Sequence, residues 1–339
     1  SYITFRTVDN FVNGHRLTWN TDERVQSYTH PLWLFTIVPF YFLTREVYLT
    51  VLLLSLMISL AAFAVFAFKV ARTRQMALLG MFILALSNAY VDYSTSGLEN
   101  PLSHLILIFF LWVYFSRSPD TKRLLLLSFI ASLGLLNRMD LALIYLPVLA
   151  FSLWQVSQSN GFLRSMAALI FGQLPFILWE MFSIFYYGFP FPNTAYSKIT
   201  TAISAAELFV RGLYYVLNSL QHDPLTLMVV FTVIVLTLVW RVKSAIPVVL
   251  GILLYILYVV KIGGDFMSGR FFAAPLLCAV AVLAQFDFDR LQLKQVLFLY
   301  IMVIFFGLAA SIPTFLLITP YAGSYRDARD IADAVSYTH

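Results

Sequence analysis

The stretch VYLTVLLLSLMISLAAFAVFAF (residues 47–68) decides the fold class, because it contains no charged side chain along its whole length. The hydrocarbon core of a bilayer is about 30 Å thick, and an α-helix needs about 20 apolar residues to cross it. A second stretch, VLFLYIMVIFFGLAASIPTFLLIT (residues 296–319), is similarly long and also contains no charged residue. Both stretches predict membrane-spanning helices.

The composition of the whole chain supports this interpretation. Charged residues make up 12% of the 339 positions and hydrophobic residues 60%, whereas an average soluble domain carries about 25% charged residues. The sequence therefore predicts an all-α polytopic membrane protein with a transmembrane bundle over residues 31–318. Residues 31–43 are short for a span and are interpreted as a re-entrant arm or half of a bent helix, so the bundle has ten or eleven helices. The ten expected spans are 47–68, 75–90, 101–116, 124–136, 141–155, 165–186, 225–240, 244–260, 271–285 and 296–318.

The charge distribution and the cysteine count argue against nucleic-acid binding, disulfide bonds and metal–thiolate sites. The net charge is +5, but no basic block accompanies it, so nucleic acid is not an expected partner. Cys278 is the single cysteine, so an intrachain disulfide is impossible, and nothing suggests a metal–thiolate site.

Basic residues are distributed unevenly over the loops. Half of the 22 lysines and arginines lie in five short loops, at 69–74, 117–123, 156–164, 241–243 and 286–295. Because cytoplasmic loops are enriched in basic residues, these short loops are expected to face the cytoplasm. All but three of the 17 acidic residues lie on the other side or at its membrane boundary. The longer polar loops are therefore expected outside the cell, in a multi-pass plasma-membrane protein.

Residues 1–30 are expected to form the first outer loop. Phe5, Val8, Phe11 and Val12 share one helical face, so residues 1–12 are interpreted as an amphipathic helix at the membrane interface. The polar stretch TDERVQSYTHPLW (residues 21–33) then leads directly into apolar sequence.

Four further polar stretches lie on the same expected side. Each alone has a structural explanation: an ion pair between Arg138 and Asp140, proline helix stops, a glycine turn, or an aromatic belt at the interface. Together they place charged side chains at helix ends on one leaflet only, and charges at membrane depth usually mark a functional site. The stretches are TSGLENP (95–101), NRMD (137–140), GFPFPNTAYSK (188–198) and KIGGDFMSGRFF (261–272).

This one-sided arrangement favours an enzyme. A carrier that alternates access usually has polar midplane residues and broken helices in two related halves, and the sequence pattern indicates neither. Basic side chains beside acidic ones suggest phosphate binding and a general base, whereas aromatic and hydroxyl groups suit a sugar. The pattern predicts a transferase that takes a group from a lipid-phosphate carrier outside the membrane.

The first outer loop is similar to that of a known family. The stretch YITFRTVDNFVNGHRLTWNTDERVQSYTHPLW (residues 2–33) resembles GT-C fold, polyprenyl-phosphate-dependent glycosyltransferases, in particular the actinobacterial terminal β-(1→2)-arabinofuranosyltransferases. The stretches SGLEN, NRMD, FPNTAYSK and GGDFMSGRF follow in the family's order, so the resemblance covers essentially residues 1–272. The chain departs from the family pattern at His15 and at Gln26-Ser27.

The resemblance implies a donor, an acceptor and missing parts. The donor would be decaprenyl-phosphate arabinofuranose, and the acceptor would be the arabinan of cell-wall arabinogalactan or lipoarabinomannan. The family's acidic pair and first transmembrane helix would precede Ser1, and residues 319–339 would begin an extracytoplasmic C-terminal region. The chain is therefore expected to be the membrane portion of a longer enzyme.

Roles within this chain follow from the expected chemistry. The bond between sugar and phosphate breaks with oxocarbenium character, so charge on the departing phosphate must be stabilised. Besides the acidic pair, Asp265 and then Glu23 are the expected catalytic carboxylates. The expected donor-phosphate ligands are Arg24, Arg138, Arg270 and Lys198. The expected sugar and acceptor contacts are Tyr28, His30, Trp33, Glu99, Asp140 and Asn193.

Several alternatives remain open at this stage. The clustered carboxylates would permit a divalent cation, and the sequence does not decide whether one is bound. Another GT-C enzyme that transfers mannose or a different pentose would share the same features. A lipid-linked sugar flippase or transporter is less favoured, and a scaffold role is least favoured.

Overall fold

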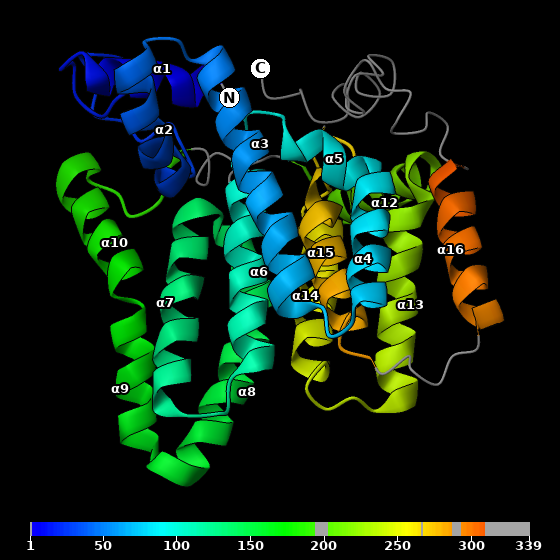
Figure 1. The fold of residues 1–339 in the computed structure, drawn as a ribbon. Helices are drawn as coiled ribbons and strands as arrows, with labels where there is room; N and C mark the ends of the chain where they lie inside the picture. Colours follow the sequence, from blue (N-terminus) through cyan, green and yellow to red (C-terminus); the bar gives the residue numbers. More distant parts are fainter. Residues whose placement is uncertain (1, 194–202, 266, 287–292, 309–339) are drawn as a thin grey trace. The chain divides into compact units, whose positions relative to one another are not determined.

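The computed structural model describes the chain except residues 1, 194–202, 266, 287–292 and 309–339. The described residues form 15 α-helices and no strand, which confirms the all-helical fold class. They divide into two compact units, each containing several helices (Figure 1). Unit 1 comprises Ser1–Ala61 and Thr95–Ala202, and unit 2 comprises Ala62–Ser94 and Ile203–His339.

The helices identify a polytopic membrane protein. Among the described residues, two helices are long and apolar enough to cross a bilayer, Tyr48–Val70 and Met139–Asn160. Three bent helix pairs qualify if each pair is counted together, which raises the number of candidate spans to as many as 5. The expected count of ten or eleven crossings stays a prediction. The bent pairs are Arg74–Leu86 with Asn88–Ser94 (78°), Phe162–Gly172 with Leu174–Tyr187 (54°), and Ala205–His222 with Pro224–Trp240 (107°).

In unit 1 the helices gather around one central helix, α7 (Thr121–Asn137), which contacts α2, α6, α8, α9 and α10 (Figure 1). Asp120 begins α7, because its carboxylate accepts the Arg123 backbone N–H at 2.7 Å. The other helices of the unit are α1 (Tyr2–Val12), α2 (Pro31–Thr44), α3 (Tyr48–Val65, within the unit as far as Ala61), α6 (Asn100–Ser116), α8 (Ala142–Asn160), α9 (Phe162–Gly172) and α10 (Leu174–Tyr187).

The amino-terminal helix α1 packs on α2 in unit 1. The Tyr41 hydroxyl of α2 donates a hydrogen bond to Asp9 Oδ1 of α1 at 2.6 Å. Val8 is fully buried, and Phe5 and Val12 pack against the same apolar cluster. The apolar face expected for residues 1–12 is therefore largely used for packing within the protein.

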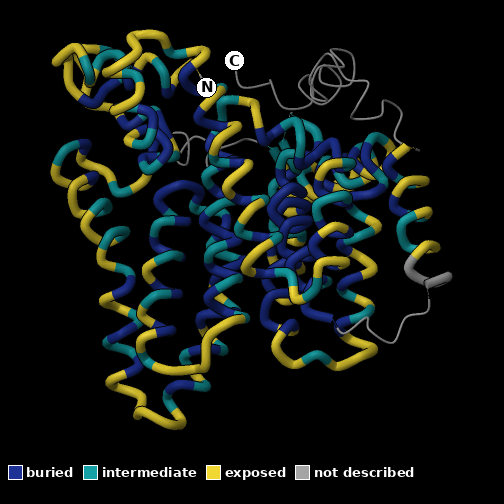
Figure 2. The backbone as a smooth tube through the Cα atoms, in the orientation of Figure 1, coloured by how far each residue is buried: buried dark blue, intermediate teal, exposed yellow. Residues whose placement is uncertain are grey.

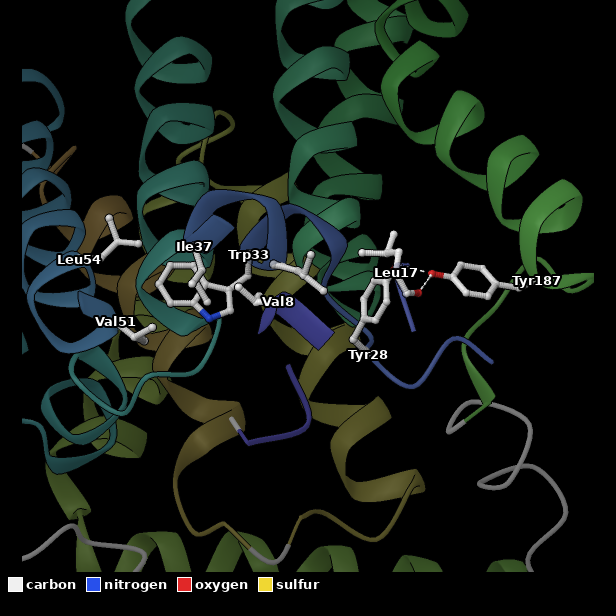
Figure 3. Packing of buried hydrophobic residues seen from close by; sticks show 9 residues of the cluster. Val8, Leu17, Tyr28, Trp33, Ile37, Val51, Leu54 and Tyr187 are labelled. Carbon is white, nitrogen blue, oxygen red and sulfur yellow. Dashed lines mark hydrogen bonds between the residues drawn. The ribbon is translucent and has the colours of Figure 1, made fainter. Parts of the chain in front are cut away.

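That apolar cluster joins the loop between α1 and α2 to the bundle of unit 1 (Figure 3). Burying a large side chain stabilises a fold by about 1.5–3 kcal/mol, and these side chains come from α1, α2, α3, α10 and the loop between α1 and α2. The cluster therefore fixes the path of that loop. Its buried members are Val8, Leu17, Tyr28, Trp33, Leu34, Ile37, Val51, Leu54 and Tyr187.

In unit 2 the central helix is α15 (Ala273–Leu283), and every residue from Ala273 to Val282 is buried. It contacts α4, α5, α13 and α14 (Figure 1). The helices around it are α4 (Arg74–Leu86), α5 (Asn88–Ser94), α12 (Ala205–His222), α13 (Pro224–Trp240), α14 (Ile246–Lys261) and α16 (Leu293–Leu308).

One helix was absent from the sequence prediction. Residues 187–224 were expected to be an outer loop throughout, but the structure places the 18-residue helix α12 there. Its signal is a capping box: the Ser204 hydroxyl accepts the Glu207 N–H at 3.2 Å, with the acidic side chain three residues after the cap. The loop interpretation was wrong because the span count considered apolar runs only.

Many large hydrophobic side chains are exposed in each unit, and Figure 2 marks the exposed positions along the backbone. Phe185 of α10 is 90% exposed and Leu163 of α9 is 84% exposed. In a soluble protein such faces would be buried, whereas a bilayer surrounds them with hydrocarbon. These surfaces agree with the membrane location of the helices.

Candidate functional site

A cluster of charged side chains forms in unit 1 from three segments that are distant in the sequence. His30 immediately precedes α2, whose first residue is Pro31, and Glu99 immediately precedes α6. Arg138 follows the last residue of α7. Because each residue lies at a helix end, the packing of the three helices determines where these side chains meet. We refer to His30, Glu99, Arg138 and Asp140 as the Glu99 cluster.

Glu99 lies between the two potential cations of the cluster. Its Oε1 is 3.8 Å from Arg138 Nε, and its Oε2 is 3.8 Å from His30 Nδ1. Arg138 also pairs with Asp140 through two contacts, of which Nε to Oδ1 is 3.1 Å. Glu99 is 2% exposed and Arg138 is 6% exposed. Charges this deeply buried are tolerated only when they are paired.

Neutral side chains hold the Glu99 cluster in position. Thr4 Oγ1 of α1 lies 2.6 Å from His30 Nε2. Asn137 Nδ2 donates to the Glu99 carbonyl oxygen at 2.9 Å and to Ser103 Oγ at 2.8 Å, which ties the end of α7 to the start of α6. The sequence prediction missed Thr4 because a threonine on a helix carries no distinctive signal. Asn137 belonged to the NRMD stretch but received no role.

The charge balance of the cluster restricts its chemistry. Arg138 carries one positive charge against the two carboxylates of Glu99 and Asp140, so the cluster is net negative when His30 is neutral. A buried negative group stabilises a nearby positive charge or accepts a proton. The net negative charge of the Glu99 cluster therefore favours those roles over the binding of an anion. The cluster brings together four of the predicted site residues.

Unit 2 contains a second pair of predicted residues, in the loop between α14 and α15. Arg270 Nη1 donates to Asp265 Oδ2 at 3.1 Å. Tyrosine hydroxyls from two helices hold this loop: Tyr93 of α5 donates to the Ser268 carbonyl at 2.8 Å, and Tyr215 of α12 donates to the Met267 carbonyl at 3.1 Å. Asp265 and Arg270 therefore sit on an anchored loop.

The remaining predicted residues that the structure describes are not part of either group. Glu23 is exposed, and its carboxylate accepts from Asn20 Nδ2 at 3.5 Å. The Arg24 guanidinium lies 5.5 Å from the ring centre of Tyr186. Asn193 is exposed, and its backbone N–H donates to the Gln26 carbonyl at 3.1 Å. Lys198 lies outside the described residues.

Tyr28 and Trp33, which were expected to contact sugar, are core residues of unit 1. Trp33 is fully buried and its Nε1 donates to the Gly97 carbonyl at 3.4 Å. The Tyr28 hydroxyl is 2.8 Å from that of Tyr187, which in turn donates to the Leu17 carbonyl at 2.7 Å (Figure 3). Burial, and then the neighbouring Tyr187, raise the pKa of Tyr28 well above its ordinary value, so its hydroxyl stays protonated. Both side chains therefore support the first outer loop.

The Tyr187 hydroxyl gives a test of this support. We expect Tyr187→Phe to lower the free energy of unfolding by about 1–3 kcal/mol, because the Tyr28 hydroxyl and the Leu17 carbonyl lose their buried partner. Thermal unfolding of the detergent-solubilised protein measures the change. Tyr186→Phe is the matched control, because it keeps the ring beneath Arg24. Equal stability of the two variants would contradict the supporting role.

The described residues contain no group of three or more histidine, cysteine, aspartate or glutamate side chains that could hold a metal ion. The carboxylates of the Glu99 cluster are instead paired with Arg138.

Comparison with known proteins gives one informative match. No family model matches the chain, and no solved structure matches it. The chain is 27% identical over 323 residues to a terminal β-(1→2)-arabinofuranosyltransferase of Mycobacterium tuberculosis, and the match covers 82% of this chain and 50% of that protein. The chain thus spans about half the length of this curated relative. At this level of identity, the polytopic helical chain is a distant homologue of a membrane arabinofuranosyltransferase.

Proposed function

We propose that the chain is the membrane portion of a glycosyltransferase of GT-C type. It would move an arabinofuranosyl unit from a decaprenyl-phosphate donor to the arabinan of a cell-wall polysaccharide, on the outer side of the membrane. The observation that carries the proposal is the Glu99 cluster, where a paired and buried carboxylate is assembled at three helix ends. The distant homology to an arabinofuranosyltransferase supports the same reaction class.

The chemistry of the transfer requires a negative group near the sugar. As the bond between the anomeric carbon and the phosphate oxygen breaks, positive charge develops on the sugar, and a hydroxyl of the acceptor must lose a proton. Glu99 carries the buried carboxylate nearest to His30, at 3.8 Å. In the proposed mechanism Glu99 stabilises the developing cation or takes the proton, and His30 relays that proton.

The proposed role of Arg138 is to hold the carboxylates. Its guanidinium contacts Asp140 twice and lies 3.8 Å from Glu99. A guanidinium that is already neutralised by two carboxylates attracts a phosphate less strongly than an unpaired one. The proposed donor-phosphate ligands are therefore Arg24 and Arg270, together with Lys198.

The unit 2 loop supplies further proposed groups. Asp265 is a candidate carboxylate, and its pairing with Arg270 at 3.1 Å keeps both side chains ordered. The apolar outer faces of the helices provide a surface for the long polyprenyl tail.

The proposed function is tested by supplying the full-length enzyme, in proteoliposomes, with decaprenyl-phosphate arabinofuranose and a synthetic arabinan acceptor. We expect an extended acceptor and released decaprenyl phosphate, both measured by mass spectrometry. Asp265→Asn is expected to lower the rate, because the proposed carboxylate loses its charge. The serine substitution of the buried Cys278 is the control variant that should remain active.

Other outcomes would identify the alternatives. Extension with decaprenyl-phosphate mannose alone would indicate another GT-C enzyme and contradict the arabinose proposal. Movement of the donor across the membrane without any extended product would indicate a transporter. Wild-type turnover of folded Asp265→Asn would remove the unit 2 loop from the proposed mechanism.

A further inference from the structure

Two helix breaks in unit 2 meet at one buried carboxylate, that of Asp223. The first break separates α4 from α5 at Ser87, with a bend of 78°, and the second separates α12 from α13 at Asp223, with a bend of 107°. Asp223 Oδ2 accepts a hydrogen bond from Ser87 Oγ at 3.0 Å and from the Ala89 backbone N–H at 2.9 Å. The Asp223 carboxylate at the second break therefore accepts hydrogen bonds from polar groups at the first break.

The same carboxylate also begins α13. Asp223 Oδ1 accepts the Thr226 backbone N–H at 3.2 Å, and Oδ2 accepts the Thr226 hydroxyl at 2.7 Å. Asp223 is 1% exposed, and Ser87 and Thr226 are fully buried. All four groups around the carboxylate donate, so an asparagine at this position would turn its amide N–H₂ toward at least one donor.

One helix arm at each break, α5 after the first and α12 before the second, holds the loop that carries Asp265 and Arg270. The arm α5 contributes Tyr93, whose hydroxyl donates to the Ser268 carbonyl at 2.8 Å. The arm α12 contributes Tyr215, which donates to the Met267 carbonyl at 3.1 Å and accepts the Phe271 N–H at 3.2 Å. Asn218, also in α12, accepts a hydrogen bond from the Ser268 hydroxyl.

We propose that Asp223 is a positioning residue for the Asp265–Arg270 loop, because it locks together the two helix arms that anchor this loop. The proposal has two parts. Its kinetic part, that the loop affects the rate of transfer, rests on the proposed function. Its structural part, the coupling of Asp223 to the loop, is independent of which sugar is transferred. The sequence prediction gave Asp223 no role, because it lay inside the expected loop 187–224.

The test uses the full-length enzyme and the variants Asp223→Asn and Ser87→Ala. Ser87→Ala removes the hydroxyl link between Asp223 and the first break, while the Ala89 N–H bond and the Asp223 cap of α13 stay in place, so it separates this side-chain coupling from simple helix capping. Asp120→Asn is the matched control, because Asp120 caps α7 in unit 1 by accepting the Arg123 backbone N–H.

The first readout reports the loop directly and does not need enzyme activity. Met267→Cys places a thiol on the loop, and the native Cys278 is buried and serves as the unreactive reference. We expect a maleimide to label Cys at position 267 about tenfold faster in the Asp223→Asn and Ser87→Ala backgrounds, corresponding to about 1.4 kcal/mol. The Asp120→Asn background should leave the rate unchanged.

The second readout is the kinetics of transfer. We expect kcat to fall by up to about 100-fold in Asp223→Asn, since a displacement of about 1 Å in a supporting group costs this much, while KM for the lipid donor changes little. Tyr93→Phe should add little to the effect of Ser87→Ala, because both act through α5.

The outcomes separate the two proposals. Faster labelling in a protein that transfers no arabinose would leave the coupling in place and contradict the proposed function. Unchanged labelling in both Asp223→Asn and Ser87→Ala, or additive effects of Ser87→Ala and Tyr93→Phe, would overturn the positioning role.

Discussion

Replacing Arg138 by methionine is expected to reduce transfer by about 100-fold or more and to lower the free energy of unfolding by about 3–5 kcal/mol. The reason is burial: Arg138 is 6% exposed and Glu99 is 2% exposed, and the guanidinium pairs with both Glu99 and Asp140. Without the guanidinium, Glu99 loses its arginine partner and remains a buried carboxylate 3.8 Å from His30. Thermal unfolding and the arabinan-extension assay measure the two effects.

A second substitution separates stability from function. Adding Glu99→Gln to Arg138→Met removes the uncompensated charge, so we expect it to recover much of the lost stability while transfer stays absent. Arg123→Met is the matched control, since Arg123 lies in α7, the helix that Arg138 follows, and is 5% exposed, but it donates to the Arg117 carbonyl at 3.2 Å. That variant should lose stability and keep its turnover per folded molecule. Wild-type turnover of Arg138→Met would exclude the Glu99 cluster from the mechanism.

Replacing Gly264 by alanine is expected to disrupt the Asp265–Arg270 loop and to stop transfer. Gly264 has φ +76°, a conformation that costs an L-residue about 1–2 kcal/mol. A Cβ atom at this position would also lie 2.5 Å from Tyr215 Cγ, the residue that anchors the loop. The expected loss of stability is about 2–5 kcal/mol when the overpacking cost is included.

The control for this variant isolates the clash. Gly161 has φ +81°, but no heavy atom lies within 4 Å of the position that its Cβ would occupy. Gly161→Ala therefore carries the backbone strain alone, and we expect a loss of about 1–3 kcal/mol with transfer preserved. If Gly264→Ala and Gly161→Ala have equal stability and equal turnover, close packing of Tyr215 on the loop does not matter for the site.

Much of the helical architecture follows from local sequence, but some boundaries do not. The run 47–68 has one apolar character throughout, and the structure places α3 and a short continuation there, as far as Val70. The run 75–90 looks equally continuous, yet its helix bends by 78° at Ser87. The bend depends on Asp223, which is distant in the sequence and satisfies the Ala89 N–H that the break exposes. A window of local hydropathy contains no information about that partner.

The roles of individual polar residues divide in a similar way. His30, Glu99 and Asp140 stand out as polar residues beside apolar runs, so the sequence could nominate them. Trp33 and Tyr28 stand out for the same reason, although they are buried supports. An aromatic residue at a helix end has the same local pattern whether it faces solvent, lipid or core. Tyr28 lies in the core because its hydroxyl meets that of Tyr187 on α10, a helix that is distant in the sequence.

The sequence by itself determined that this is a helical membrane protein, because hydrophobic length and the scarcity of charge are properties of consecutive residues. It also nominated the polar stretches that are proposed to carry the chemistry, since polar groups at the ends of apolar helices are conspicuous. Only the tertiary structure decided that Arg138 is shared between Glu99 and Asp140, and that Asp223 joins two helix breaks. These partners meet through helix packing, which depends on the fit of side chains from distant segments and leaves no periodic pattern in the chain.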